Sequence, residues 1–274
     1  MVENKVTIQL VEDQIEEIKN PPKFKEGHLL LSGDGIFYTV QGEGASVGFP
    51  AIFVRLHMCN LACDWSKSGG EICDAWYTWK KDTKEYQTEH HLIDFFELRD
   101  KILTYPGERI VFTGGEPLMQ QQHINEFLEG PGRVFLGGHV IEIETNGSYK
   151  LAEKTSLFRS ALKSIVQINC SPKLSNAGNK SPHPYSYEAL EQFNQLPLSY
   201  FKFVVSDHKD IEEISAIAKS VGIISDKIII MPEGTSNEKI AGQRMLDLIE
   251  IAKMNNWRIS PRLQCEVWGN KRGV

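Results

Sequence analysis

The chain has 274 residues, 41% of them hydrophobic, which is enough for one large domain or two modest ones with a real core. Its formal net charge of −6 excludes a sequence-independent grip on nucleic acid. No run approaches the roughly 18 apolar residues that a membrane-spanning helix needs, and the first residues lack the pattern of a signal peptide. Five cysteines, an odd number, do not indicate a disulfide framework, so we expect a cytoplasmic protein with reduced thiols.

Residues 1–30 are expected to form an N-terminal extension, and residues 31–274 a single domain. From residue 51 onward, strand and helix patterns alternate almost to the end of the chain. We expect strands at 51–56, 109–113, 139–144, 166–170, 200–205 and 227–231. Helices are expected at 90–104, 118–128, 151–163, 186–195, 209–221 and 236–254. Ser236 is predicted to cap the last helix, and Gly222 to end the helix before it.

Consecutive strand–helix units predict a parallel sheet, which is either doubly wound or curled into a barrel. The unusual residues follow the strands, at Cys59, 113–117, 144–147, 169–173, 206–207 and 231–234. A barrel brings every strand end to one mouth, whereas a doubly wound sheet concentrates function at one switch point. We therefore expect an incomplete (β/α)6 barrel.

The cysteines that follow the first strand, Cys59, Cys63 and Cys73, indicate a metal centre. Three thiolates can hold a four-iron cluster and leave one iron free to bind another molecule. Zinc normally takes four closed ligands in paired short spacings, and here the fourth would have to be His57, Cys170 or an acid. The strand-end setting favours the cluster, and a structural zinc site is the alternative.

Three further segments have both a structural and a functional interpretation. In Thr113-Gly-Gly-Glu-Pro117, the glycines form a tight turn, or they expose backbone to a ligand whose ammonium group bonds to Glu116. Ser171-Pro-Lys173 is a surface turn, or it binds a carboxylate or a ribose. Gln41-Gly-Glu-Gly44 is a flexible loop, or its amide and carboxylate read the edge of a heterocycle.

Arg55 lies inside an apolar run, where an unpaired guanidinium would be costly. It either pairs with an internal acid or binds a substrate carboxylate in bidentate fashion.

A resemblance covers most of the chain, from about Ile36 to Val274. It rests on the segments 37–44, 50–56, 113–117, 144–147, 171–173 and 268–274. Together these resemble the radical S-adenosylmethionine enzymes of the 7-carboxy-7-deazaguanine synthase family, which serve queuosine and other 7-deazapurine pathways.

The cysteine spacing departs from the C-x-x-x-C-x-x-C pattern of these enzymes, which would place the third cysteine at Ser66. One interpretation is a lost ligand. We favour an insertion, from Ser66 to Ile72, because the run from Cys73 to Trp79 restores the family's cysteine–aspartate pattern. The implied cluster ligands are then Cys59, Cys63 and Cys73.

The resemblance also implies a magnesium ligand, a Thr or Ser after the cysteine–aspartate pair. Ala75 stands there and has no side-chain oxygen. Either Ser66, Asp74 or water replaces that ligand, or the dependence on Mg2+ is weakened in this chain.

The resemblance implies conversion of 6-carboxy-5,6,7,8-tetrahydropterin to 7-carboxy-7-deazaguanine, with release of ammonia, using a [4Fe–4S] cluster and S-adenosylmethionine. It implies cofactor contacts from Gly114, Gly115, Glu116, Asn146, Ser171, Pro172, Lys173, Met231, Pro232, Glu233 and Gly234. It implies substrate contacts from Val40, Gln41, Gly42, Glu43, Arg55, Thr113, Gln264 and the C-terminal Val274. Relatives often have histidine where Gln264 stands.

We also expect a flavodoxin- or ferredoxin-type electron donor and a homodimer. The alternatives are another radical enzyme, such as a glycyl-radical activase, and a non-enzymatic zinc or iron–sulfur protein.

Overall fold

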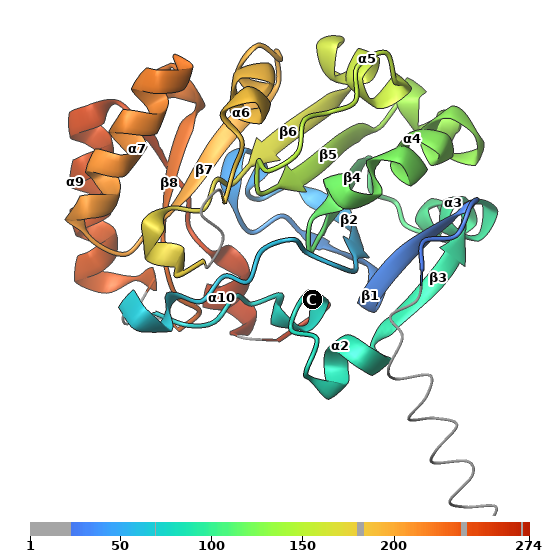
Figure 1. Ribbon diagram of the computed structural model, residues 1–274, viewed down its shortest axis with the longest axis horizontal. Helices are drawn as coiled ribbons and strands as arrows, with labels where there is room; N and C mark the ends of the chain where they lie inside the picture. Colours follow the sequence, from blue (N-terminus) through green and yellow to red (C-terminus); the bar gives the residue numbers. More distant parts are fainter. Residues whose placement is uncertain (1–22, 69, 180–183, 237–239, 270) are drawn as a thin grey trace, which may run out of the picture.

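A mixed nine-stranded sheet forms the centre of the protein in the computed structural model (Figure 1). The structure describes residues 23–68, 70–179, 184–236, 240–269 and 271–274. The strand order is β3-β1-β2-β4-β5-β6-β7-β8-β9; β1 is antiparallel to both of its neighbours, and the strands from β2 to β9 are parallel. The strands are β1 (His28–Val40), β2 (Pro50–Leu56), β3 (His90–Asp94), β4 (Arg109–Gly114), β5 (Val140–Thr145), β6 (Val166–Cys170), β7 (Ser199–Val205), β8 (Ile228–Pro232) and β9 (Arg258–Ile259).

Most helices lie between these strands in the sequence, and α10 follows the last strand. They are α2 (Lys84–Thr88), α3 (Phe95–Leu103), α4 (Gln121–Glu129), α5 (Ser156–Leu162), α6 (Tyr187–Asn194), α7 (His208–Val221), α9 (Gly242–Asn255) and α10 (Leu263–Trp268). Short 3-10 turns are η1 (Gly44–Ser46), η2 (Trp65–Ser68), η3 (Trp76–Thr78), η4 (Pro117–Gln120), η5 (Pro131–Gly137), η6 (Ser175–Ala177) and η7 (Ser225–Lys227). Figure 1 shows α3, α4, α5, α6, α7 and α9 following one another along the outer side of the curved sheet, with α10 across its inner side. No helix among the described residues is long and apolar enough to cross a membrane.

The six predicted strands are confirmed as β2, β4, β5, β6, β7 and β8, each shifted by no more than one residue at either end. The prediction of one helix over 90–104 is wrong, because residues 90–94 pair with β1 as strand β3. The Asp94 side chain then accepts hydrogen bonds from the N–H groups of Phe96 and Glu97, so α3 begins only at Phe95.

The structure confirms the predicted end of one helix and contradicts the predicted start of another. Gly222 ends α7 as predicted, with a left-handed φ of 73° that favours glycine. The predicted cap at Ser236 is wrong for α9, because α9 begins at Gly242 and its N-cap residue, Ala241, makes no side-chain cap. Residues 237–239 of that prediction lie outside the described residues.

Side-chain alternation along the strands separates a core face from a polar face. Ile141 and Ile143 of β5 are fully buried in the main apolar cluster beneath the helices, together with Phe112 and Phe203. Glu142 and Glu144 alternate with them and face the inner side of the sheet. The polar residues that could do chemistry are therefore gathered on the inner face.

Candidate active site

A cavity of about 630 Å³ opens on the inner side of the sheet. Its walls come from the segments that follow β1, β2, β4, β5, β6 and β8 and from the last residues of the chain. It is lined by most of the predicted site residues, namely Cys59, Cys63, Cys73, Asp74, Gly114, Gly115, Asn146, Ser171, Lys173, Met231, Glu233, Gly234, Val40, Gln41, Gly42, Glu43, Arg55, Thr113, Gln264 and Val274. The remaining four predicted residues, Ser66, Glu116, Pro172 and Pro232, do not line it.

The insertion between Cys63 and Cys73 folds back on itself and returns the chain to the cavity. Asp64 and Ile72 form an antiparallel bridge, and the Cys73 N–H donates to the Cys63 carbonyl at 3.2 Å. Ser66 is exposed at the start of this loop, where its N–H donates to the Asp64 carboxylate. The spacing in the sequence is therefore long, while the three cysteines still reach one cavity wall.

The chemistry of the cysteine wall fits an iron–sulfur cluster better than a zinc ion. Burial raises the pKa of Cys59 to about 12 and raises those of Cys63 and Cys73, so a neighbouring cationic centre is needed to stabilise the thiolates. Across the described part of the chain, no three His, Cys, Asp or Glu side chains gather as they would around one metal ion. A cluster distributes its thiolates over several irons, whereas zinc needs four ligands around one centre.

The Gly114-Gly115 turn packs directly on the loop that carries Cys59. A Cβ atom at Gly114 would lie 2.1 Å from the Leu56 carbonyl oxygen, and one at Gly115 would lie 2.0 Å from that of Met58. The Gly115 N–H also donates to the Leu56 carbonyl at 3.1 Å. Glycine is thus required here for close approach of two backbones, which fixes the cysteine loop.

The Glu116 carboxylate, which is expected to bond to an ammonium group, has hydrogen-bond partners within the protein. Its fully buried carboxylate accepts hydrogen bonds from the N–H groups of Leu118 and Asn146, at 2.9 and 2.7 Å, and from Thr145 Oγ1 at 2.8 Å. Burial raises the pKa of Glu116 to about 7. Glu116 therefore joins the turn after β4 to the end of β5, and it is not among the residues that line the cavity.

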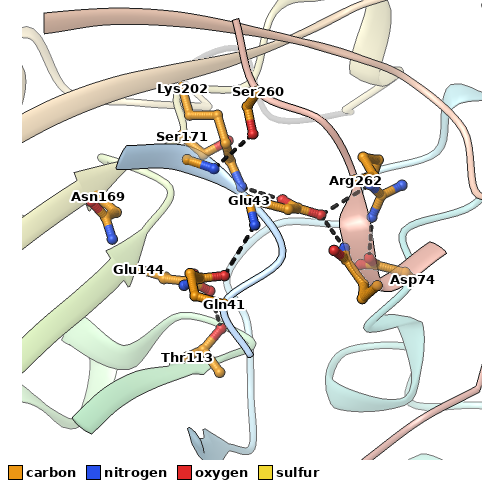
Figure 2. Close-up of polar contacts among 12 residues, drawn as sticks. Gln41, Glu43, Asp74, Thr113, Glu144, Asn169, Ser171, Lys202, Ser260 and Arg262 are labelled. Carbon is orange, nitrogen blue, oxygen red and sulfur yellow. Dashed lines mark hydrogen bonds and ion pairs between the residues drawn. The ribbon is translucent and has the colours of Figure 1, made fainter. Parts of the chain in front are cut away.

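A network of charged side chains lines the cavity and reaches Asp74, the residue after Cys73 (Figure 2). The Glu43 carboxylate lies between Lys202 and Arg262, and its Oε1 accepts from Arg262 Nε at 2.9 Å. Arg262 Nη2 donates to Asp74 at 2.7 Å, and Gln264 Nε2 donates to Glu43. Burial acts to raise the pKa of Glu43, yet the two cations hold it well below its usual range. Glu43 is thus a permanent anion in the cavity.

Gln41 is held by a second acid, Glu144. Gln41 Nε2 donates to Glu144 Oε1 at 2.9 Å, and Thr113 Oγ1 donates to the other oxygen (Figure 2). This contact orients the Gln41 amide. Its oxygen, Oε1, accepts a hydrogen bond from the Glu43 N–H at 3.3 Å.

Arg55 lines the same cavity, with its guanidinium 5.3 Å from the centre of the Phe37 ring. No acid among the described residues lies within ion-pair distance of it. The geometry therefore does not support the interpretation that Arg55 pairs with an internal acid.

No family model matches the chain. It is 32% identical over 238 residues to a 7-carboxy-7-deazaguanine synthase of Pyrobaculum aerophilum, covering 87% of this chain and 95% of that relative. The chain belongs to the 7-carboxy-7-deazaguanine synthase family. The synthase of Koribacter versatilis is 29% identical over 83% of this chain and 89% of its own, and that of Rickettsia prowazekii is 33% identical over 69% of each.

Among solved structures, QueE from Escherichia coli resembles this chain with a TM-score of 0.61 and 24% identity, over 86% of this chain and 94% of that one. This likeness concerns the fold. Membership in the synthase family favours the main interpretation over a glycyl-radical activase or a non-enzymatic metal-binding protein.

Three residues of this synthase-family site were not predicted as site residues from the sequence: Glu144, Lys202 and Arg262. Lys202 could have been found, because it interrupts the apolar strand Tyr-Phe-Lys-Phe-Val-Val at a position that faces inward. Arg262 follows a strand of only two residues, and no periodic pattern marks its position.

The residues present do not fit a magnesium ion. Ala75 lines the cavity without a side-chain oxygen, Ser66 is exposed elsewhere, and Asp74 is already paired with Arg262. Magnesium prefers several oxygen ligands in near-octahedral geometry.

Proposed function

We propose that this chain converts 6-carboxy-5,6,7,8-tetrahydropterin to 7-carboxy-7-deazaguanine with release of ammonia. The observation that carries this proposal is that one cavity of the family fold brings the cysteine wall together with Gln41, Glu43 and Arg55. Its volume, about 630 Å³, lies in the range of roughly 300–1,000 Å³ that small-molecule sites span.

Cys59, Cys63 and Cys73 would hold a [4Fe–4S] cluster. When bound, the cluster and S-adenosylmethionine supply the radical that abstracts a hydrogen atom from the pterin. The residues of the chain hold the two small molecules in register and exclude water from the reacting atoms.

On the cofactor side, Lys173 lines the cavity beside the cysteines, and its Nζ donates to Ser171 Oγ at 3.0 Å. We assign this pair to the carboxylate or ribose of S-adenosylmethionine, with Gly114, Gly115 and Asn146 nearby. The segment Met231–Gly234, at the end of β8, is assigned to the adenine.

On the substrate side, the fixed Glu43 anion accepts hydrogen bonds from the pterin N–H groups, and the oriented Gln41 amide reads the neighbouring edge. Arg55 pairs with the pterin carboxylate. Val40, Gly42, Thr113, Gln264 and Val274 complete this wall.

We further propose that β2, β4, β5, β6, β7 and β8 form an incomplete (β/α)6 barrel. Their sequential order and the row of helices on one side of the sheet support this interpretation over a doubly wound sheet (Figure 1). In this proposal residues 31–274 are one catalytic domain. Its first strand, β1, begins at His28, three residues before the proposed boundary. A homodimer and a flavodoxin- or ferredoxin-type donor are also proposed; light scattering and anaerobic reduction assays test them.

The test of function is an anaerobic turnover assay of reconstituted protein with dithionite, S-adenosylmethionine and 6-carboxytetrahydropterin, read by mass spectrometry. We expect 7-carboxy-7-deazaguanine together with 5′-deoxyadenosine. Both products should be lost in Cys73→Ala and retained in the matched variant Ser66→Ala. Deoxyadenosine without the deazaguanine would contradict the substrate, and neither product from cluster-loaded protein would contradict the activity.

A further inference from the structure

The segment after Cys73 offers few side-chain oxygen ligands to a divalent cation. Ala75 has only a methyl group, and its carbonyl already accepts bonds from Thr78 N and Thr78 Oγ1, at 2.9 and 2.7 Å. Asp74 is the remaining oxygen donor beside the cysteines, and one of its carboxylate oxygens, Oδ2, is bonded to Arg262.

The Arg262 guanidinium lies beside Asp74, and each of its three nitrogens donates a hydrogen bond. Nε donates to Glu43, Nη1 to the Gly234 carbonyl and Nη2 to Asp74. Its side chain is only 9% exposed. One planar cation therefore ties together the pterin-side loop, the loop after β8 and the cysteine loop, which is the geometry in which arginine is superior to lysine.

Within the directly bonded network of Glu43, Asp74, Lys202 and Arg262, the charges balance without a metal ion. Glu43 and Asp74 contribute two negative charges, and Lys202 and Arg262 contribute two positive charges in direct contact with them. A divalent cation at Asp74 would have to displace this guanidinium or lie beside it, and like charges in a partly desolvated cavity repel strongly.

We propose that the Arg262 guanidinium is the fixed cation of this site, taking the place of a magnesium ion. It acts as a positioning residue through Glu43 and Asp74, and the chain binds no Mg2+ there. The turnover measurement in the test below rests on the proposed function. The measurement of metal binding does not depend on it.

The test uses the reconstituted holoenzyme with S-adenosylmethionine, with and without 6-carboxytetrahydropterin, and Mn2+ as the magnetic probe for Mg2+. We expect the electron paramagnetic resonance signal of free Mn2+ to be unchanged by the wild-type protein and by Ala75→Thr. The double variant Ala75→Thr/Arg262→Gln gains an oxygen ligand and loses the guanidinium, so it should bind Mn2+ and reduce that signal.

Turnover provides the second readout. Wild-type activity should not change with Mg2+ or with EDTA. Arg262→Gln should lose at least about tenfold in kcat/KM, Arg262→Lys should retain more because the charge remains, and added Mg2+ should restore activity only in the double variant. Arg258→Gln, an exposed arginine stacked on Tyr200, is the matched control and should behave as wild type.

Saturable binding of Mn2+ by the wild-type protein, or a tenfold loss of its turnover in EDTA, would overturn the proposal. If Arg262→Gln does not fold, the wild-type Mn2+ titration and Arg262→Lys still decide. If no variant makes the deazaguanine, the proposed function fails, while the Mn2+ titration tests Arg262 independently.

Discussion

The loss of the Glu116 carboxylate should destabilise the fold itself. Glu116→Ala would leave three donors in the interior without an acceptor, on Leu118, Thr145 and Asn146. Each costs about 1–3 kcal/mol, so about 6 kcal/mol together. The variant also removes a buried charge whose pKa of about 7, against the usual 4.5, corresponds to about 3 kcal/mol at pH 8. The net expectation is a loss of about 3 kcal/mol in the free energy of unfolding.

The assay is urea unfolding of the full-length protein at pH 8 before cluster reconstitution, because a bound cluster prevents two-state analysis. Glu250→Ala is the matched control, since Glu250 is an exposed partner of Lys253 and its loss should change stability by no more than about 0.5 kcal/mol. If Glu116→Ala unfolds like the control and loses only affinity for S-adenosylmethionine, the structural role argued for Glu116 is refuted.

Three further predictions concern pH, substrate and cluster. The folded pKa of Glu116, about 7, exceeds its unfolded value of 4.5, so its stabilising contribution is present below pH 4.5 and is lost as the pH rises through 7. Over that range, the free energy of unfolding of the wild-type protein relative to Glu116→Gln should fall by about 3 kcal/mol. A difference that does not change with pH would contradict the pKa shift. Arg55→Ala should lower kcat/KM for the pterin about 10- to 100-fold, more than Arg55→Lys, and equal values for all three proteins would exclude a carboxylate contact. Gly115→Ala, whose Cβ would lie 2.0 Å from the Met58 oxygen, should lose most of its bound iron and sulfide, whereas Gly137→Ala, with open space around it, should keep them.

The parallel strands and the residues that follow them could be predicted because apolar runs and turn residues are local signals. Strand β3 could not, because His90–Asp94 is recognisable as a strand only through its pairing with β1. The hydrogen bonds of Glu116 to Thr145 and Asn146 could not be predicted, because a sequence does not show which side of a turn a carboxylate faces. The Lys202–Glu43 pair joins residues 159 positions apart, so it forms only in the folded chain and no local sequence signal marks it.

The insertion gives a final test of how the cysteines are placed. Deletion of residues 66–72 would join Trp65 to Cys73 and restore the C-x-x-x-C-x-x-C spacing. We expect the deletion variant to keep its iron, because loop length alone has a small entropic cost. It would, however, remove contacts between the insertion and the loop after β8, where the Glu71 N–H donates to Glu233 at 3.0 Å and Glu71 accepts from Thr235. Loss of these charge-assisted bonds should weaken binding of S-adenosylmethionine about tenfold, measured by equilibrium dialysis. Unchanged affinity would mean that the insertion has no part in the cofactor site, and loss of iron would mean that Cys73 is placed by the insertion itself.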